Sequence, residues 1–275
     1  MNKNGFTLIE ILIAIFMFGI VAITFTAIFQ SSSKSYYINS SFVGLRQNLR
    51  TSIDFLTGDL SRAGFKGYNM TDWTFASSDA GFLQAGSNVI QYTMDLNSNG
   101  VIDIGEDITI SLEAGADFDN DGIVDSSTGT AALERTVAGL ATQQVIMENI
   151  EGIGFAYAYD TDDDNELDFN DANGNGTPDI GENTIWAYDS DSDESLDMQI
   201  DPTGINPEKS LTVPIPIENI RAVRLWILAR ASRSKKWTKD TNTYFLGKET
   251  VTPAGDNFKR ELVSATILCR NMLTR

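Results

Sequence analysis

The sequence predicts an α+β fold: a long N-terminal helix packs on a mostly antiparallel β-sheet that carries acidic insertions. Three observations lead to this prediction. A long uncharged run near the N-terminus is followed by apolar residues at helical spacing, and short segments rich in β-branched and aromatic residues then alternate with runs of Asp, Asn and Gly. With 275 residues of which 42% are hydrophobic, the chain can bury a core, and we expect one soluble domain rather than two.

The N-terminal run has the length of a membrane span. From Ile11 to Phe29 there are 19 residues without a charge, and a helix of this length spans about 30 Å, the thickness of the hydrocarbon core. Lys3 precedes the run, which favours a cytoplasmic N-terminus. A cleaved signal peptide would have a shorter apolar region and an A-x-A-like site, whereas a plain signal anchor stays open.

Beyond Gln30 the helix is expected to become amphipathic. Apolar residues recur at steps of three and four, which places them on one helix face: Phe42, Leu45, Leu49, Ile53, Leu56 and Leu60. We expect one helix from Phe6 to Ala63, with two helices joined at the serine run 31–33 as the alternative. Gly64 is the expected C-cap.

Seven strands are predicted from β-branched and aromatic segments bounded by Gly, Asn and Asp. They are Asn88–Met94, Asp107–Leu112, Val145–Met147, Ile150–Tyr159, Thr184–Tyr188, Ile220–Ala231 and Glu261–Leu268. Residues 95–128 and 160–201 are expected to be acidic insertions between them.

Composition excludes several kinds of catalytic site. The chain has no His and one Cys, Cys269, so Ser-His-Asp triads, Cys-His pairs and Cys/His zinc sites are impossible. Cys269 lies in a predicted strand, where we expect a buried thiol, with an intermolecular disulfide as the alternative. Paired carboxylates could hydrolyse glycosides, but the acids here have metal-loop spacing, so we expect no enzymatic activity.

Negative charge is concentrated in one part of the chain. Between Asp95 and Asp201 there are 27 acidic residues and one basic residue, a net charge of −26, whereas the remainder has 11 acidic and 19 basic residues, a net charge of +8. Carboxylates at this density repel one another unless cations neutralise them. Nucleic acid is not predicted as a partner, because its phosphates would be repelled.

Two acidic segments have the spacing of a twelve-residue calcium loop, and both end in Asp-Ile-Gly-Glu. Oxygen-bearing side chains stand at positions 1, 3, 5, 9 and 12, a Gly at position 6 allows the sharp turn, and position 7 offers its carbonyl. The first loop (95–106) has Asp95, Asn97, Asn99, Val101, Asp103 and Glu106 as candidate ligands. The fourth loop (171–182) has Asp171, Asn173, Asn175, Thr177, Asp179 and Glu182.

Three further segments match the pattern in part. The second loop (117–128) offers Asp117, Asp119, Asp121, Ile123 and Asp125, with Thr128 at position 12. The third loop (160–171) offers Asp160, Asp162, Asp164, Glu166 and Asp168, with Asp171 at position 12 and therefore shared with the fourth loop. The fifth loop (189–200) offers Asp189, Asp191, Asp193, Ser195 and Asp197, with Ile200 at position 12.

These loops predict two to five calcium sites. Ca²⁺ takes six to eight hard oxygens, and alternate residues of a tightly wound loop converge on one ion, whereas Mg²⁺ demands stricter octahedral geometry. The flanking segments are predicted strands, so the sites are expected to be isolated loops without paired helices. Solvated acidic turns that bind no ion are the alternative.

Beside the apolar run, the segment Gly5-Phe6-Thr7-Leu8-Ile9-Glu10 resembles the processing motif of type IV pilins and type II secretion pseudopilins. The resemblance implies a leader of residues 1–5, cleavage between Gly5 and Phe6 by a prepilin peptidase, and N-methylation of Phe6. It also implies that Glu10 neutralises the N-terminal amine of a neighbouring subunit during assembly. An acid in hydrocarbon is tolerable only when paired. Residues 6–30 would then form the filament core.

Two further segments, Asp59–Phe65 and Phe258–Asn271, resemble parts of PilW-type minor pilins, with GspJ-type pseudopilins as near neighbours. The resemblance implies a structural or priming subunit of a type IV pilus, anchored in the bacterial inner membrane before it enters the pilus, with other pilins as partners. A type II secretion pseudopilin and a calcium-dependent adhesive tip subunit are the alternatives. For adhesion, Trp186, Trp226, Trp237 and the basic run Arg230–Lys239 are candidate ligand contacts.

Overall fold

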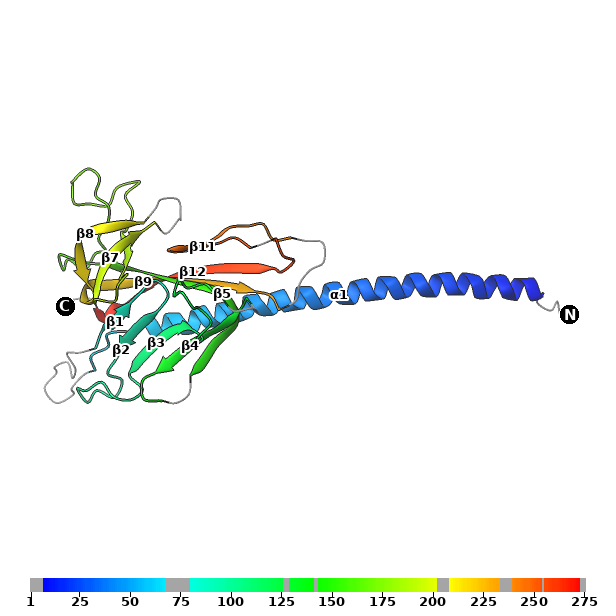
Figure 1. The fold of residues 1–275 in the computed structure, drawn as a ribbon, viewed down its shortest axis with the longest axis horizontal. Coiled ribbons are helices and arrows are strands. Elements are labelled where there is room, and N and C mark those ends of the chain that lie inside the picture. The colour runs from blue at the N-terminus through cyan, green and yellow to red at the C-terminus, as the bar shows by residue number, and fades with distance from the viewer. Residues whose placement is uncertain are drawn as a thin grey trace.

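The structure is a computed structural model that describes residues 7–67, 80–125, 129–140, 143–201, 208–232, 239–253 and 255–272. One helix, α1 (Leu8–Leu60), runs 53 residues without a break. Its first half projects from a β-rich domain, and its second half lies against that domain, with the chain's two ends at opposite ends of the molecule (Figure 1). Leader residues 1–5 and Phe6 lie outside the described residues.

The helix is continuous across both places where a break was considered. The serine run 31–33 and Gly44 are helical, so the two-helix alternative is wrong. Thr7 caps the N-terminus, and the chain leaves the helix after Leu60. Gly64 follows with a φ of 72°, in the left-handed region that glycine adopts without steric cost.

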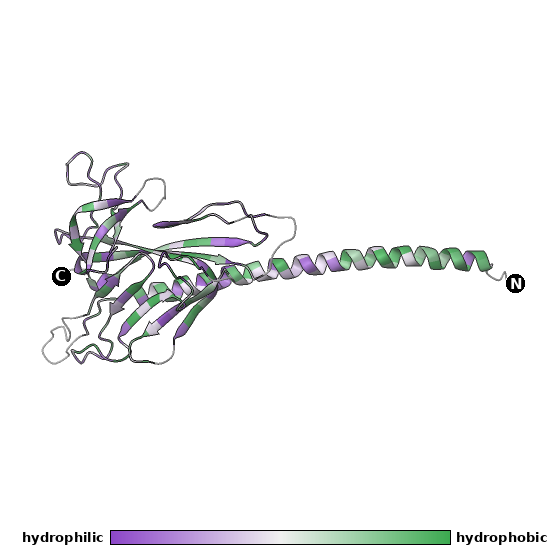
Figure 2. Cartoon of the chain, viewed as in Figure 1, coloured by the Kyte–Doolittle hydropathy of each residue, from purple (hydrophilic) through white to green (hydrophobic). Residues whose placement is uncertain are grey.

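The two halves of α1 differ in their surroundings, as Figure 2 shows. The apolar side chains of the first half are exposed, Phe18 at 75% and Ile28 at 65% among them. In the second half Leu45, Leu49 and Leu56 are at most 6% exposed and belong to the domain core. The predicted amphipathic face is therefore confirmed.

The domain contains a ten-stranded antiparallel sheet and a separate hairpin. In the described residues the large sheet comprises β1 (Phe82–Ala85), β2 (Ile90–Thr93), β3 (Asp107–Leu112), β4 (Ala131–Val137), β5 (Gln144–Tyr159), β6 (Trp186–Tyr188), β7 (Ser195–Ile200), β8 (Lys209–Pro216), β9 (Ile220–Arg230) and β12 (Arg260–Leu268). The hairpin is β10 (Tyr244–Leu246) with β11 (Glu249–Val251). Short 3₁₀ turns follow β8 (Ile217–Asn219) and β12 (Arg270–Met272).

β5 joins the two parts of the large sheet. Its first half pairs with β4 in the meander that begins at β1, and its second half pairs with β9, which in turn pairs with β12. At Tyr157 one edge of β5 meets β6 and the other meets β9. The hairpin crosses β5 where Gly154 leaves room, because a Cβ there would collide with the carbonyl oxygen of Leu246.

An ion pair fixes the end of α1 to the meander. Arg135 of β4 donates from Nε to Oδ2 of Asp59 at 2.7 Å, and the hydroxyl of Tyr92 in β2 donates to the same oxygen at 2.7 Å. Arg135 is the single basic residue of the acidic block, and it neutralises a carboxylate that would otherwise be nearly buried without a partner.

All seven predicted strand regions contain strands, although two of them merge into β5. Six strands of the sheet and hairpin lay outside the predicted strands: β1, β4, β7, β8, β10 and β11. β7 occupies residues that were assigned to the fifth loop. β4 was not predicted because the charged residues Glu134 and Arg135 interrupt its apolar pattern. β8 was not predicted because it is largely exposed and contains two prolines.

Candidate cation-binding loops and the assembly helix

The acidic loops all lie between neighbouring strands of the large sheet. The first loop joins β2 to β3, the second lies between β3 and β4, the third and fourth follow one another between β5 and β6, and the fifth joins β6 to β7. The first, third and fifth loops begin within two residues of the end of a strand. Because the sheet fixes both ends, the carboxylates are held near one another by the backbone.

The first loop folds around Asp95, which is fully buried. Its carboxylate accepts hydrogen bonds from the backbone N–H groups of Asn99 and Gly100 at 3.2 and 2.9 Å. Glu106 closes the loop by accepting from the N–H groups of Leu96 and Asp103, both at 2.8 Å. One carboxylate oxygen of Asp103, Oδ2, accepts hydrogen bonds from the side-chain amides of Asn97 and Asn99 at 3.1 and 2.6 Å.

The fourth loop repeats this arrangement position by position. The carboxylate of Asp171 accepts from the N–H groups of Asn175 and Gly176, and Glu182 accepts from those of Ala172 and Asp179. The amides of Asn173 and Asn175 both donate to Oδ2 of Asp179 at 2.8 Å. Hydrogen bonds from the backbone, that of Gly176 first, lower the pKa of Asp171. The shared spacing thus specifies a shared structure.

The second, third and fifth loops close differently. In each, the Asp at position 9 accepts the N–H of position 2, as Asp125, Asp168 and Asp197 accept from Phe118, Thr161 and Ser190. Three carboxylates in each loop bring oxygens within 4.8 Å of one another. The groups are Asp117, Asp119 and Asp125; Asp160, Asp162 and Asp168; and Asp189, Asp191 and Asp193. Such groups could hold a metal ion.

The third loop contains an oxygen without a partner. The side chain of Asp160 is 0% exposed, and its Oδ1 accepts no hydrogen bond. Its Oδ2 accepts a hydrogen bond from the N–H of Asn165 at 3.0 Å and lies 3.7 Å from Nε of Arg221. That Nε atom is itself buried without a hydrogen-bond partner. A buried carboxylate oxygen left unpaired is costly. Asp160 also belongs to one of the three carboxylate groups, and a bound cation is one way to satisfy such an oxygen.

Two details of the predicted loops differ in the structure. Asp171 does not close the third loop, since its carboxylate is occupied by backbone N–H groups of the fourth. The fifth loop is shorter than twelve residues, because Ser195 and Ile200 belong to β7. Thr128 lies outside the described residues.

Glu10 lies in the first turn of α1. The Thr7 backbone N–H and hydroxyl both donate to Oε2 of Glu10 at 2.8 Å, and the Thr7 hydroxyl accepts from the Glu10 N–H at 3.3 Å. The carboxylate is thus held against the N-terminal residue of the described helix cap. Gly5 and Phe6 themselves lie outside the described residues. Of those described, α1 is the helix long and apolar enough to cross a membrane.

The candidate ligand contacts for adhesion are mostly in the core. Trp186 and Trp226 are 6% and 3% exposed, and Arg224 lies against both rings. Trp237 falls outside the described residues. Cys269 is fully buried, as expected, and burial raises the pKa of its thiol to about 12. It is therefore an inert thiol and not a reactive one.

Comparison with known proteins gives two family matches and a similar solved structure. The model of a family described as Type IV Pilus-assembly protein W matches residues 122–271, and that of the prokaryotic N-terminal methylation motif matches residues 1–26. A type IV-like pilin from Thermus thermophilus has a similar solved structure, with 12% identity, a TM-score of 0.41, and coverage of 84% of this chain and 98% of its own. No curated protein matches the chain significantly. Because the first match spans more than half of the chain, this protein belongs to the type IV pilus-assembly protein W family, the minor pilins that carry a prepilin methylation motif.

Proposed function

We propose that this chain is a structural minor pilin, without enzymatic activity, that initiates, primes or decorates a type IV pilus. The observation that carries the proposal is the exposed apolar half of α1 directly behind a prepilin motif. Apolar side chains in such number require lipid before assembly or neighbouring helices afterwards. The chain would be held in the inner membrane, cleaved by a prepilin peptidase, and packed against other pilins through α1.

Glu10 would take part in that assembly. In the single chain its carboxylate is satisfied by Thr7 alone. Cleavage after Gly5 would create an amine at Phe6 on each subunit. A carboxylate inside an apolar environment is strongly stabilised by such a cation, so Glu10 would exchange a local hydrogen bond for an ion pair with a neighbouring subunit.

Substitution of Gly5 tests the maturation step. Gly5→Glu should leave the precursor uncleaved, because the peptidase would meet a bulky charged residue at the scissile bond, and the pilus should lose this subunit. Immunoblots that separate precursor from mature chain measure the first effect, and piliation measures the second. Asn4→Gln, one residue away, should be processed normally. Normal processing of Gly5→Glu together with unchanged piliation and secretion after gene deletion would count against the proposal.

We further propose that the acidic loops bind calcium outside the cell and stiffen the domain. Three loops group carboxylates within 4.8 Å of one another, and Asp160, a member of one group, has a buried oxygen without a hydrogen-bond partner. Hard oxygen ligands in irregular loops suit Ca²⁺ better than Mg²⁺. Affinities in the range of extracellular modules, about 10⁻⁴–10⁻³ M, are expected.

Two adjacent aspartates provide a matched test of the third loop. Asp162 belongs to the carboxylate group, whereas Asp163 is not one of its members and pairs with Arg221 at 3.2 Å. Asp162→Asn should weaken calcium binding at this loop by roughly tenfold, because it removes one charged ligand. Asp163→Asn should leave the number of sites and their affinities unchanged. Calorimetric titration of the purified chain measures both, and equal effects of the two variants would contradict the assignment.

A further inference from the structure

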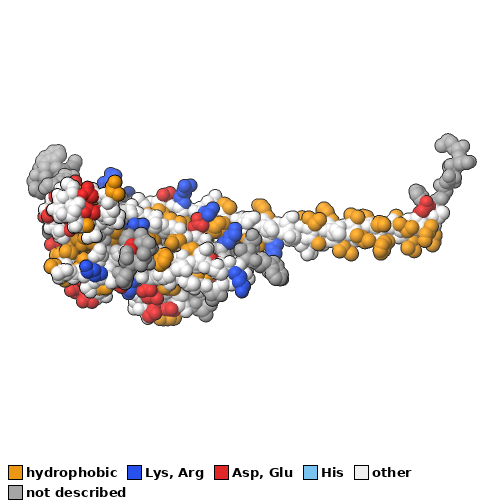
Figure 3. Space-filling model, turned by 90° about the horizontal axis from the view of Figure 1, so that it is seen from above, with side chains coloured by type: hydrophobic (Ala, Val, Ile, Leu, Met, Phe, Trp, Pro, Cys, Tyr) orange, Lys and Arg blue, Asp and Glu red, His pale blue; other side chains and the backbone are white. Residues whose placement is uncertain are grey.

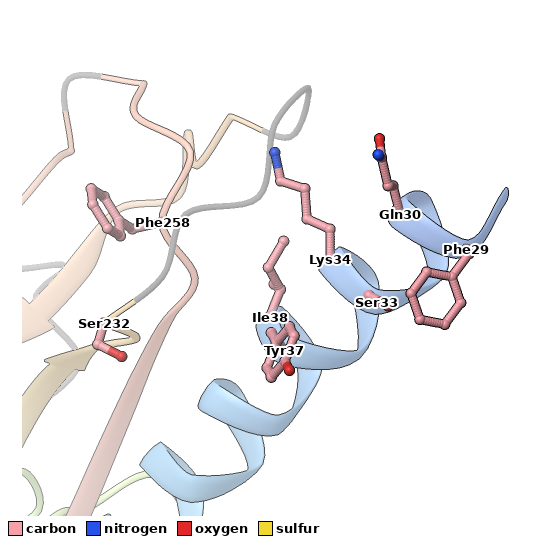
Figure 4. Close-up of a pocket in the computed structure, with 8 residues that line it drawn as sticks. All are labelled: Phe29, Gln30, Ser33, Lys34, Tyr37, Ile38, Ser232 and Phe258. Atoms are coloured by element: carbon pink, nitrogen blue, oxygen red, sulfur yellow. The ribbon is translucent and has the colours of Figure 1, made fainter. Parts of the chain in front are cut away.

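A groove lies between α1 and the domain at the point where the helix leaves the sheet. It has a volume of about 640 Å³. Figure 4 shows Lys34 and Gln30 rising from the helix on one side and Ser232 and Phe258 on the domain facing them. Ile38, which is 6% exposed, lies at the inner end. The groove thus combines an apolar lining with one cationic side chain, and none of its lining residues is acidic.

The depth of this groove in a membrane follows from the sequence of α1. Phe29 is the last apolar residue before the polar segment Gln30–Ser33 and also the first residue that lines the groove. Lys34 is five residues further on, about 7 Å along the helix axis. Phospholipid headgroups occupy roughly the first 5–8 Å outside the hydrocarbon core. When α1 spans the membrane, the groove therefore opens at the level of the headgroups.

Positive charge surrounds the groove. Between Glu10 and Asp54, α1 carries Lys34, Arg46 and Arg50 and no acidic residue. Figure 3 shows Lys and Arg side chains gathered over the part of the domain next to the projecting helix. Lys259 follows Phe258 and places its Nζ 4.6 Å from the centre of the Phe42 ring, one turn beyond Ile38.

The two lysines differ from the arginines in their partners. Within the described parts of the chain, neither Lys34 nor Lys259 forms an ion pair with a carboxylate. Arg46 pairs with Glu261 at 3.1 Å, and Arg230 pairs with Glu151 at 3.1 Å while covering the ring of Phe258. Glu261 and Glu151 are thus engaged with arginines, and the lysine charges remain available to an external anion.

We propose that this groove binds the phosphate and glycerol region of an anionic phospholipid while the chain is anchored in the membrane. Lys34 would contact the phosphate, and Phe29 would pack against the upper acyl chain. Lysines at a membrane surface each favour anionic lipid by about fivefold. The inference rests on the membrane anchoring that the proposed function includes, and it adds a lipid preference to it.

The relative association of spin-labelled phosphatidylglycerol and phosphatidylcholine with the full chain in phosphatidylcholine vesicles tests the proposal. Phosphatidylglycerol should associate several-fold more strongly, and Lys34→Gln should reduce this preference by about fivefold at most. Arg50→Gln is the matched control, since it removes the same charge from the same helix about 24 Å beyond Lys34. It should leave the preference unchanged, and free glycerol phosphate should not compete.

Two results would overturn the lipid site. One is an equal association of both lipids with the unaltered chain. This result is also expected if a second copy of the chain fills the groove and excludes lipid. The other is a loss of preference in Arg50→Gln equal to that in Lys34→Gln. Flotation of the chain with the vesicles reports anchoring separately, so failure of the lipid site is distinguished from failure of the proposed function.

Discussion

Removal of calcium should lower the melting temperature of the domain by about 10–20 °C. Three all-carboxylate loops with dissociation constants near 10⁻⁴ M would together contribute about 5 kcal/mol at about 2 mM calcium. For a domain of this size, each kcal/mol shifts the melting temperature by roughly 2–4 °C. Differential scanning calorimetry of the full chain in detergent, with chelator and then with calcium restored, measures the shift.

The two kinds of loop should respond differently to the chelator. Asp103 and Asp179 each receive two Asn side-chain amides, so the first and fourth loops keep their internal hydrogen bonds without an ion. In the other three loops the grouped carboxylates repel one another when no cation is present. Hydrogen exchange should therefore accelerate first in the second, third and fifth loops. An unchanged melting temperature, or recovery with magnesium as complete as with calcium, would refute calcium stabilisation.

Arg260→Gln should destabilise the domain by about 3–5 kcal/mol, because it leaves the buried carboxylate of Asp240 without a cation and the buried carboxylate of Glu151 with Arg230 alone. The side chain of Arg260 is 4% exposed. Its guanidinium contacts Glu151 at 2.9 Å, Asp240 at 3.2 Å and Asp256 at 2.6 Å. Arg46→Gln is the control, since its pair with Glu261 is exposed and worth about 1 kcal/mol or less. Chemical denaturation measures both, and similar losses would show that burial of the Arg260 pairs does not matter.

The difference between the unaltered chain and Arg260→Gln should also depend on pH. A hydrogen bond from Arg260 lowers the pKa of Asp256 below its ordinary value, which is about 3.9 in unfolded chains. A lowered pKa in the folded state contributes stability above the unfolded value, and this stability disappears as pH falls through the folded value. The gap between the two proteins should thus be constant near neutral pH and shrink below about pH 4.

The sequence predicts an element of this structure best where a single pattern, such as helical spacing of apolar residues, determines which residues are buried. The helical spacing of Leu45, Leu49 and Leu56 identifies a buried face because nothing else competes for it. β4 was missed because Glu134 and Arg135 interrupt its apolar pattern, and the reason for Arg135 is a carboxylate on α1, 76 residues earlier in the chain. Such a partner is visible only once the fold is known.

In the acidic loops, too, the sequence predicts local hydrogen bonds but not contacts that depend on the rest of the fold. The complete twelve-residue spacing of the first and fourth loops predicts their hydrogen bonds correctly. In the third loop, spacing alone assigns Asp171 to two loops, and the structure decides between them through the N–H groups of Gly174 and Gly176. The unpaired oxygen of Asp160 depends on burial by distant strands, and no sequence pattern reports that.

The backbone hydrogen bonds that flank the first and fourth loops bear on how the sequences of homologous proteins diverge in length. The N–H of Met94 donates to the carbonyl of Glu106 at 2.9 Å, and the N–H of Asn170 donates to that of Asn183 at 3.0 Å. Each twelve-residue unit therefore enters and leaves the sheet between two residues that already face each other, in the place of an ordinary hairpin turn. A gene could gain, duplicate or lose such a unit without shifting any strand against its neighbour, so length differences among homologous genes should accumulate at these turns while the sheet stays the same.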